Sequence, residues 1–241
     1  RFFRAQDFSK KDNEEAEKLI LKALEIYRRT SRKYKITECC EILVNMYIYS
    51  NDDLTLKYLE EGLRTSLEIN NDLMISQFFR QYAVYHYSKG DIPQFLNYSK
   101  KMKEIYQRID DKVGLGIAYR YVGEFYKLTN KWEEAYQELQ KSYDIFKETD
   151  HNLEFAATQE SLGDLFKIQG DLRKALKYYN QAHQLIADLN QYPWFVIENI
   201  AEIYFLMGDV DRSLDMHKEL MERYEARSQK KGISDNLCKL G

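Results

Sequence analysis

A short polar break between two helical patterns recurs six times along the 241 residues, and its spacing constrains the fold more than any other feature. Successive breaks are 40, 39, 40, 40 and 38 residues apart. A regular period of this length is typical of chains built from stacked units, each of which buries its apolar face against its neighbours. The breaks are Lys11–Asp12, Asn51–Asp52, Gly90–Asp91, Asn130–Lys131, Gly170–Asp171 and Gly208–Asp209.

Apolar and small residues flank the breaks at steps of three and four, the period of an amphipathic helix. After the Gly170 break, for example, Ala175, Tyr179 and Ala182 follow this period. Each unit is therefore predicted to hold a helix A before the break and a helix B after it. The predicted A helices cover 36–50, 73–88, 112–129, 156–169 and 194–207. The predicted B helices cover 13–30, 53–69, 92–109, 132–148, 172–187 and 210–228.

The residue types at the breaks suit the end of one helix and the start of the next. Glycine or asparagine adopts the left-handed conformation that ends helix A, and the following aspartate accepts a hydrogen bond from the first free amides of helix B. Within helix A, Gly123 and Gly163 are expected to let the partner helix approach closely. With only 10 glycines and 2 prolines, the composition also favours an all-α fold.

The motif around Gly163 resembles a tetratricopeptide repeat (TPR). It reads Leu162-Gly163-Asp164-Leu165-Phe166, followed by Gly170-Asp171, Ala175, Tyr179 and Ala182. The resemblance implies a right-handed superhelical solenoid of antiparallel helix pairs. The period exceeds the common TPR unit of about 34 residues. The longer unit resembles TPR arrays of bacterial signalling proteins, including peptide-pheromone receptors of the Rap kind and sensor regions fused to output domains.

The pattern predicts one solenoid domain over residues 1–241, because no linker or low-complexity segment interrupts it. Both ends fall inside a unit, so we expect the natural protein to continue, and we expect the uncapped ends to pair with other copies or to fray. The predicted units are a partial repeat at 1–30, repeats at about 36–70, 73–110, 112–150, 156–190 and 194–230, and the start of a further repeat at 233–241.

Charge and hydropathy exclude several classes of partner. The 36 lysines and arginines against 39 aspartates and glutamates give a formal charge of −3, so no global basic field attracts nucleic acid. No apolar run approaches the length of a membrane span. Three cysteines form no disulfide framework, and the first residues show no secretion signal, so a cytoplasmic location is expected. Cys39 and Cys40 are interpreted as small core residues.

No enzymatic or cofactor motif is recognisable. The glycines of Val113-Gly114-Leu115-Gly116 follow no strand and are interpreted as a helix start instead of a phosphate-binding loop. The four histidines show no metal-ligand spacing, and His86 occupies an aromatic packing position. Paired acids such as Asp110–Asp111 are interpreted as helix caps. We therefore expect no catalytic residues, no cofactor and no metal, and a non-enzymatic chain.

In the TPR family, the A helices line a concave groove where ligands usually lie. The resemblance transfers these inward positions to Asn45, Tyr49, Gln77, Arg80, Tyr87, Arg120, Glu124, Lys127, Glu160, Asp164, Lys167, Glu198, Glu202 and Phe205. The alternative is that they are solvated surface residues. Some TPR domains grip a terminal carboxylate with a lysine and an asparagine. In this sequence Asn45 occupies the asparagine position of that clamp, but Glu41 occupies the position where the clamp has a lysine. The negative charge of Glu41 argues against binding of a terminal carboxylate there.

The charges of these positions change along the sequence. Arg80 and Arg120 hold the same position in successive units, and Glu160 and Glu198 hold it in the next two. A groove that changes from basic to acidic would orient a peptide by charge. The alternative is that the arginines pair with groove carboxylates such as Glu124.

Together these features predict a scaffold that binds a protein segment or a peptide, in bacterial signalling or regulation. The alternative is a sensory or regulatory region of a larger enzyme or transcription factor whose active domain lies outside this chain. An enzyme acting within these residues is disfavoured, because no nucleophile, base and orienting group converge at a recognisable spacing.

Overall fold

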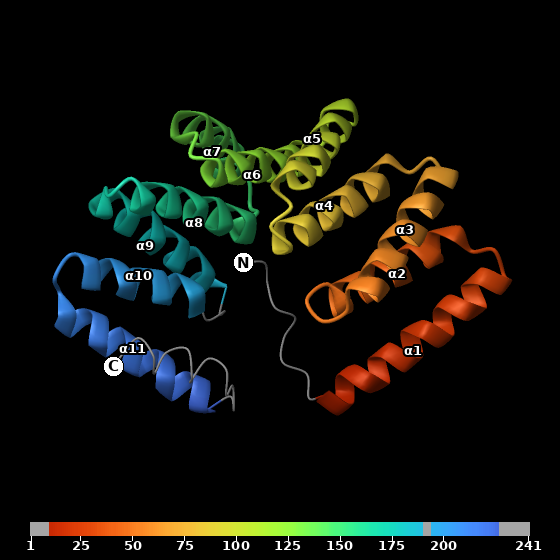
Figure 1. The fold of residues 1–241 in the computed structure, drawn as a ribbon, viewed down its shortest axis with the longest axis horizontal. Helices are drawn as coiled ribbons and strands as arrows, with labels where there is room; N and C mark the ends of the chain where they lie inside the picture. The colour runs from red at the N-terminus through yellow and green to blue at the C-terminus, as the bar shows by residue number, and fades with distance from the viewer. Residues whose placement is uncertain (1–9, 190–193, 227–241) are drawn as a thin grey trace. The chain divides into compact units, whose positions relative to one another are not determined.

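The computed structural model describes residues 10–189 and 194–226, and every regular element in these ranges is an α-helix (Figure 1). Above the level of the single repeat, the chain divides into two compact parts, residues 1–118 and 119–241, which are called the first unit and the second unit from here on. Their boundary falls inside α6 (Lys112–Leu128). The helices are α1 (Lys10–Arg29), α2 (Lys33–Tyr47), α3 (Asp52–Glu68), α4 (Asp72–Ser88), α5 (Ile92–Arg108), α6 (Lys112–Leu128), α7 (Trp132–Lys147), α8 (Asn152–Ile168), α9 (Leu172–Asp188), α10 (Trp194–Leu206) and α11 (Val210–Ala226).

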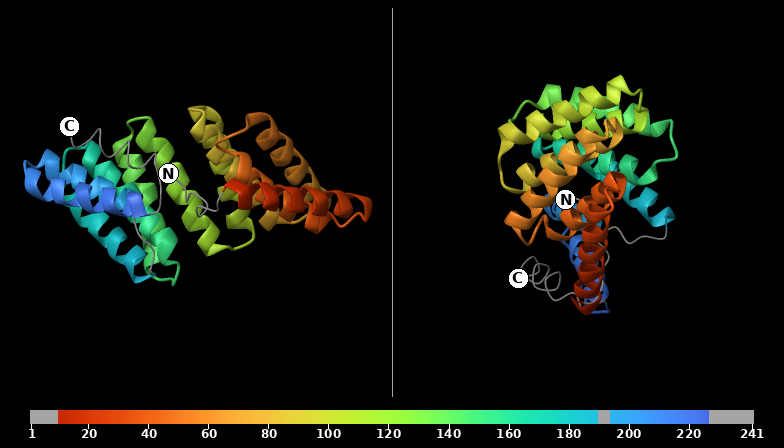
Figure 2. Two further views of the ribbon diagram at one scale, coloured as in Figure 1. Left: turned by 90° about the horizontal axis from the view of Figure 1, so that it is seen from below. Right: turned by 90° about the vertical axis from the view of Figure 1, so that its right-hand side faces the viewer.

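Each unit is built from antiparallel helices that pack on their neighbours in sequence (Figure 2). In the first unit α2 packs against α1 and α3, and α4 against α3 and α5. In the second unit α8 packs against α7 and α9, and α10 against α9 and α11. The predicted all-α array of helix pairs is confirmed. From here α2, α4, α6, α8 and α10 are called the A helices and the others the B helices.

The predicted helices are all present, and three of them begin three or four residues earlier than predicted; α1 begins at Lys10, three residues early. Helix α2 lies three residues earlier than predicted at both ends, and α8 begins at Asn152, four residues early. The break at Lys11–Asp12 is wrong, because α1 already begins at Lys10 and includes both residues. Arg1 to Ser9, Pro193 and the further repeat at 233–241 lie outside the described residues.

Most breaks have the predicted backbone. Gly90, Gly170, Gly208 and Asn130 adopt φ angles of 71°, 80°, 83° and 59°, the left-handed region that ends a helix. After the three glycines, the side chains of Asp91, Asp171 and Asp209 accept hydrogen bonds from the amides three residues later, at 3.2, 3.1 and 3.3 Å. These caps stabilise the starts of α5, α9 and α11, typically by about 1 kcal/mol each.

Asn51 does not have the predicted left-handed conformation. Its φ is −151°, and its side chain caps α3 by accepting a hydrogen bond from the amide of Leu54 at 3.0 Å. The reason is that α2 already ends at Tyr47, so the residues that follow make the turn and Asn51 is left to start the next helix. An asparagine suits either role, so the residue type alone did not distinguish them.

Close helix contacts at glycine form the core as predicted. A Cβ atom on Gly163 would lie 2.7 Å from the ring of Tyr179, and one on Gly123 would lie 2.7 Å from Leu139. Both distances are shorter than a tolerable contact, so only glycine lets these helices pack without displacement. The prediction for Cys40 also holds, since it is fully buried in the core of the first unit beside Cys39.

Candidate binding face on the A helices

In the second unit, the predicted site residues occupy equivalent places near the ends of three A helices. Six residues before each break stands an acid, and three residues before it stands a lysine in two of the three helices. The acids are Glu124 on α6, Asp164 on α8 and Glu202 on α10; the lysines are Lys127 and Lys167. On α10 the lysine is replaced by Phe205.

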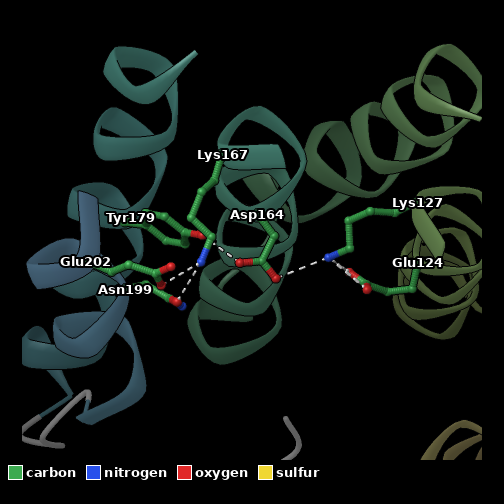
Figure 3. A network of polar contacts seen from close by, with 7 residues as sticks. All are labelled: Glu124, Lys127, Asp164, Lys167, Tyr179, Asn199 and Glu202. Atoms are coloured by element: carbon green, nitrogen blue, oxygen red, sulfur yellow. Dashed lines mark hydrogen bonds and ion pairs between the residues drawn. The ribbon is translucent and has the colours of Figure 1, made fainter. Parts of the chain in front are cut away.

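These side chains form a network that crosses from helix to helix (Figure 3). Lys127 Nζ donates to Glu124 Oε1 at 2.9 Å and to Asp164 Oδ2 on α8 at 3.1 Å. Lys167 Nζ donates to Glu202 Oε2 on α10 at 3.0 Å. Each lysine therefore reaches the acid of the next A helix. We call these five residues the acid–lysine ladder.

The ladder is also anchored from a B helix. Tyr179 on α9 donates its hydroxyl to Asp164 Oδ1 at 2.6 Å, so both carboxylate oxygens of Asp164 are engaged (Figure 3). Burial alone would raise the pKa of Asp164, but the charge of Lys127 and the hydrogen bond from Tyr179 outweigh it and hold that pKa below its usual value. The sequence pattern identified Tyr179 as a packing residue and gave no sign of this polar contact.

Two of the predicted ligand contacts are buried. Lys127 and Arg120 are each only 7% exposed. Arg120 Nη2 donates to Glu154 Oε2 at 2.7 Å, which ties α6 to the first turn of α8. Arg120 thus pairs with a carboxylate, as the alternative held, and the carboxylate is Glu154 of the next A helix, while Glu124 is bonded to Lys127. Both cations lie where their charge holds neighbouring helices together.

Glu160 and Glu198 hold equivalent positions on α8 and α10 but have different surroundings. Glu198 accepts a hydrogen bond from the Tyr224 hydroxyl at 2.8 Å. Glu160 has no hydrogen bond or ion pair with any described residue, although it is only partly exposed. Loss of water around the carboxyl raises the pKa of Glu160, and the negative charge of Asp164 raises it further.

Exposed apolar residues lie at the last turn of the A helices, beside the ladder. At the position two residues before the break, Leu128, Ile168 and Leu206 are 41%, 53% and 52% exposed. The neighbouring Phe205 is 61% exposed. Phe205 is among the residues predicted from the sequence and the other three are not, although they share one position of the repeat.

In the first unit, the predicted residues lie on α2 and α4 or just after them. Asn45 and Tyr49 are exposed, and Gln77, Arg80 and Tyr87 are partly exposed. Burial raises the pKa of Glu41, and the charge of Arg80 acts against this rise. The buried Gln81, which the sequence analysis missed, has its amide nitrogen 3.5 Å from Asn45 Oδ1.

Other features of the described residues do not coincide with this face. An open cavity of about 610 Å³ in the first unit is lined by α3 residues and by Tyr82 of α4, and it includes none of the predicted site residues. Among the described residues, no group of three or more histidine, cysteine, aspartate or glutamate side chains has a metal-binding arrangement. None of the helices in those same ranges has the length and apolar character needed to span a bilayer.

Comparisons with known proteins agree with this architecture. The family model described as tetratricopeptide repeat matches residues 114–187. The TPR repeat-containing protein MJ1428 of Methanocaldococcus jannaschii is 24% identical over 208 residues, covering 86% of this chain. The match spans 33% of the length of that protein, so the chain corresponds to about a third of its curated relative.

Solved structures share the fold at low sequence identity. The crystal structure of BtubC (BKLC) from P. vanneervenii has a TM-score of 0.69 at 14% identity, covering 89% of this chain and 93% of that one. A Rap protein complexed with competence and sporulation factor has a TM-score of 0.60 at 14% identity, covering 94% of this chain and 70% of that one. The family match identifies residues 114–187 as tetratricopeptide repeats, and the solved structures show that the chain shares the fold of tetratricopeptide repeat arrays.

Proposed function

We propose that this chain is a non-enzymatic module that holds a peptide or a segment of another protein against its A helices. The observation that carries the proposal is the row of exposed apolar side chains at equivalent positions, Leu128, Ile168 and Leu206, together with Phe205. Exposed apolar residues that gather beside fixed charges are typical of an interaction surface. Repeat proteins present such surfaces along successive repeats.

The contacts proposed for the ligand follow the exposure of each side chain. Arg120 and Lys127 are buried between helices, so their part is to fix the spacing of α6 and α8. The remaining predicted residues have exposed surface and are the proposed contacts: Asn45, Tyr49, Gln77, Arg80 and Tyr87 in the first unit, and Glu124, Glu160, Asp164, Lys167, Glu198, Glu202 and Phe205 in the second.

The finer proposal is a role in bacterial signalling or regulation in the cytoplasm. A structural neighbour, the Rap protein, is complexed with competence and sporulation factor, and this supports a peptide as the ligand class here. A second candidate is a sensory or regulatory region of a larger enzyme or transcription factor. The observation in its favour is that the chain corresponds to 33% of the length of its curated relative.

A site-specific crosslink tests the proposed face. A photoreactive benzoylphenylalanine replaces Phe205 on α10, and a matched variant carries it at Tyr136, which is 36% exposed on the B helix α7. The proposal predicts adducts between position 205 and the bound peptide or protein segment. An excess of the unlabelled parent chain should suppress these adducts, because it competes for the ligand. An excess of the unlabelled variant Ile168→Ser/Leu206→Ser should not suppress them. Equal adducts from both positions, or none from Phe205, would contradict it.

A further inference from the structure

The open cavity of about 610 Å³ in the first unit has an apolar wall that the proposed function does not use. Five of its six lining residues belong to the B helix α3, and the sixth, Tyr82, reaches it from the A helix α4. The α3 residues are Glu60, Leu63, Arg64, Leu67 and Glu68. Leu67 is 52% exposed, so its side chain has apolar surface to offer a partner. The volume lies within the range of ligand-binding pockets.

Tyr82 brings an unpartnered hydroxyl to this cavity. The residue is only 7% exposed, and its hydroxyl has no hydrogen-bond partner in the part of the chain that the structure describes. The hydroxyl oxygen is not itself fully enclosed, so it is open to the cavity that the side chain lines. The ring is fixed by stacking on Tyr98 of α5, with centroids 4.6 Å apart and planes at 11°. Because a buried tyrosine hydroxyl usually has a partner, the cavity offers a fixed polar group to an acceptor from outside.

The same hydroxyl remains a donor. Loss of water raises the pKa of Tyr82, and Tyr98 and the negative charge of Glu60 raise it further. The group therefore keeps its proton, so the acceptor that suits it is a carbonyl or carboxylate oxygen.

The rim of the cavity has an excess of positive charge. Arg64 lines both this cavity and a smaller one of about 380 Å³ that shares Glu60 with it, and the smaller cavity adds Lys57. Neither Arg64 nor Lys57 forms an ion pair with a described residue. Among the acids of the two cavities only Glu60 is also without one, since the others are bonded as Glu61–Arg28 and Glu68–Lys33. Two unpaired cations against one unpaired acid favour an acidic partner.

We propose that this cavity is a second binding site, which takes an extended segment of a partner protein by one large apolar side chain and an acidic residue next to it. The apolar side chain packs against Leu63 and Leu67, a main-chain carbonyl accepts the hydrogen bond from Tyr82, and the acid lies beside Arg64. An extended segment fits better than a helix, because the carbonyl groups of a helix are bonded within it. The cavity is open, so it suits one anchoring side chain of a larger partner better than a free small molecule, which such a site would leave largely in water.

The test follows the methyl signals of Leu63 and Leu67 by NMR in the full chain, which separates binding at this cavity from binding at the A helices. The probe is acetyl-leucyl-glutamate methylamide. Two matched probes replace its leucine by alanine, which removes the large apolar side chain, or its glutamate by glutamine, which removes the charge.

Three variants of the chain are compared with the parent. Tyr82→Phe removes the hydroxyl and keeps the stacked ring. The control Tyr85→Phe makes the same change at a buried tyrosine of α4 that does not line the cavity. Arg64→Gln removes the exposed charge of the rim. Circular dichroism of each variant shows whether the helices are retained.

The inference predicts saturable shifts of both methyl signals with the leucyl-glutamate probe. Binding should weaken about threefold or more with either matched probe and in Tyr82→Phe, as for the loss of one hydrogen bond or apolar contact. Tyr85→Phe should bind as the parent does, and Arg64→Gln should no longer distinguish glutamate from glutamine. Absence of shifts, an equal response to a matched probe, or unchanged affinity in Tyr82→Phe would overturn the inference. None of these results bears on the proposed function, because the signals report on α3 alone.

Discussion

Lys127 Nζ lies 3.1 Å from Asp164 Oδ2, so a buried lysine at the end of α6 is bonded to an acid in the last turns of α8. The same relation recurs one repeat later between Lys167 and Glu202, at 3.0 Å. A contact repeated at the same positions of successive helices fixes their spacing within the second unit.

Replacing Lys127 by methionine should destabilise the second unit strongly. The change keeps the length of the side chain but leaves Glu124 and Asp164 without their shared cation, and breaking a buried pair in this way costs about 3 to 5 kcal/mol. Urea unfolding measures the loss. The control is Lys141→Met, whose ammonium pairs with Glu138 at the surface of α7 and should contribute less than about 1 kcal/mol. Equal losses in the two variants would show that the ladder does not stabilise this unit.

A side chain at Gly163 should separate α8 from α9. Even the Cβ of an alanine would lie 2.7 Å from the Tyr179 ring, so Gly163→Leu must displace that ring or the helix, at about 1 to 3 kcal/mol. Thermal unfolding is compared with Gln137→Leu on the exposed face of α7. A melting temperature for Gly163→Leu equal to that of the parent would contradict the packing described here.

Stability should depend on pH through Glu160. Loss of water and the charge of Asp164 raise the pKa of Glu160 to about 7, above the 4.5 of an ordinary glutamate. The folded state therefore binds the proton more tightly, and the stability gained from the protonated carboxyl is present below about pH 4.5 and is lost as the pH rises through about 7. Glu160→Gln should be more stable than the parent at pH 8, on the order of 1 kcal/mol, with the difference closing toward pH 5.

Denaturant unfolding of both proteins across this pH range measures the effect. A constant difference between them, or a parent that is more stable at pH 8, would show that Glu160 is ionised at no cost in the folded protein.

Tyr179→Phe should isolate the polar contribution of this residue from its packing. The ring still fills the space beside Gly163, but Asp164 loses the hydrogen bond to Oδ1 and its pKa should rise toward the ordinary value. The expected loss of stability is about 1.5 to 3 kcal/mol near neutral pH, as for a hydrogen bond to a charged group. A carboxyl titration of Asp164 by NMR that is identical in the two proteins would contradict this role.

The helices could be predicted from the sequence because each one repeats the same apolar period between recognisable ends. The backbone conformation of the turns was harder to predict than the helices. Asn70 and Asp110 adopt left-handed φ angles of 50° and 55° between repeats, a conformation that the sequence analysis assigned to the breaks alone. Asparagine and aspartate tolerate this region better than other residues with a side chain, but they serve equally well as caps.

The side on which the candidate residues lie could be predicted from the sequence, but the contacts between them could not. Repeat spacing placed Glu124, Lys127, Asp164 and Lys167 on one side of their helices, which the structure confirms for the ladder. Which acid each cation meets depends on the stacking of α6 on α8, to which the sequence of one helix gives no guide. The pairing of Arg120 on α6 with Glu154 on α8, a residue outside the predicted face, is the clearest example.

Peptide affinity of a variant altered on the exposed part of the face tests the central claim most directly. Once the crosslink from Phe205 has identified a bound segment, isothermal titration compares the parent with Ile168→Ser/Phe205→Ser, two residues that are 53% and 61% exposed and absent from the buried core. The account predicts at least tenfold weaker binding, about 1.4 kcal/mol, with an unchanged helical signal. Unchanged affinity would contradict the account, because the exposed apolar residues of the A helices would then contribute nothing to binding.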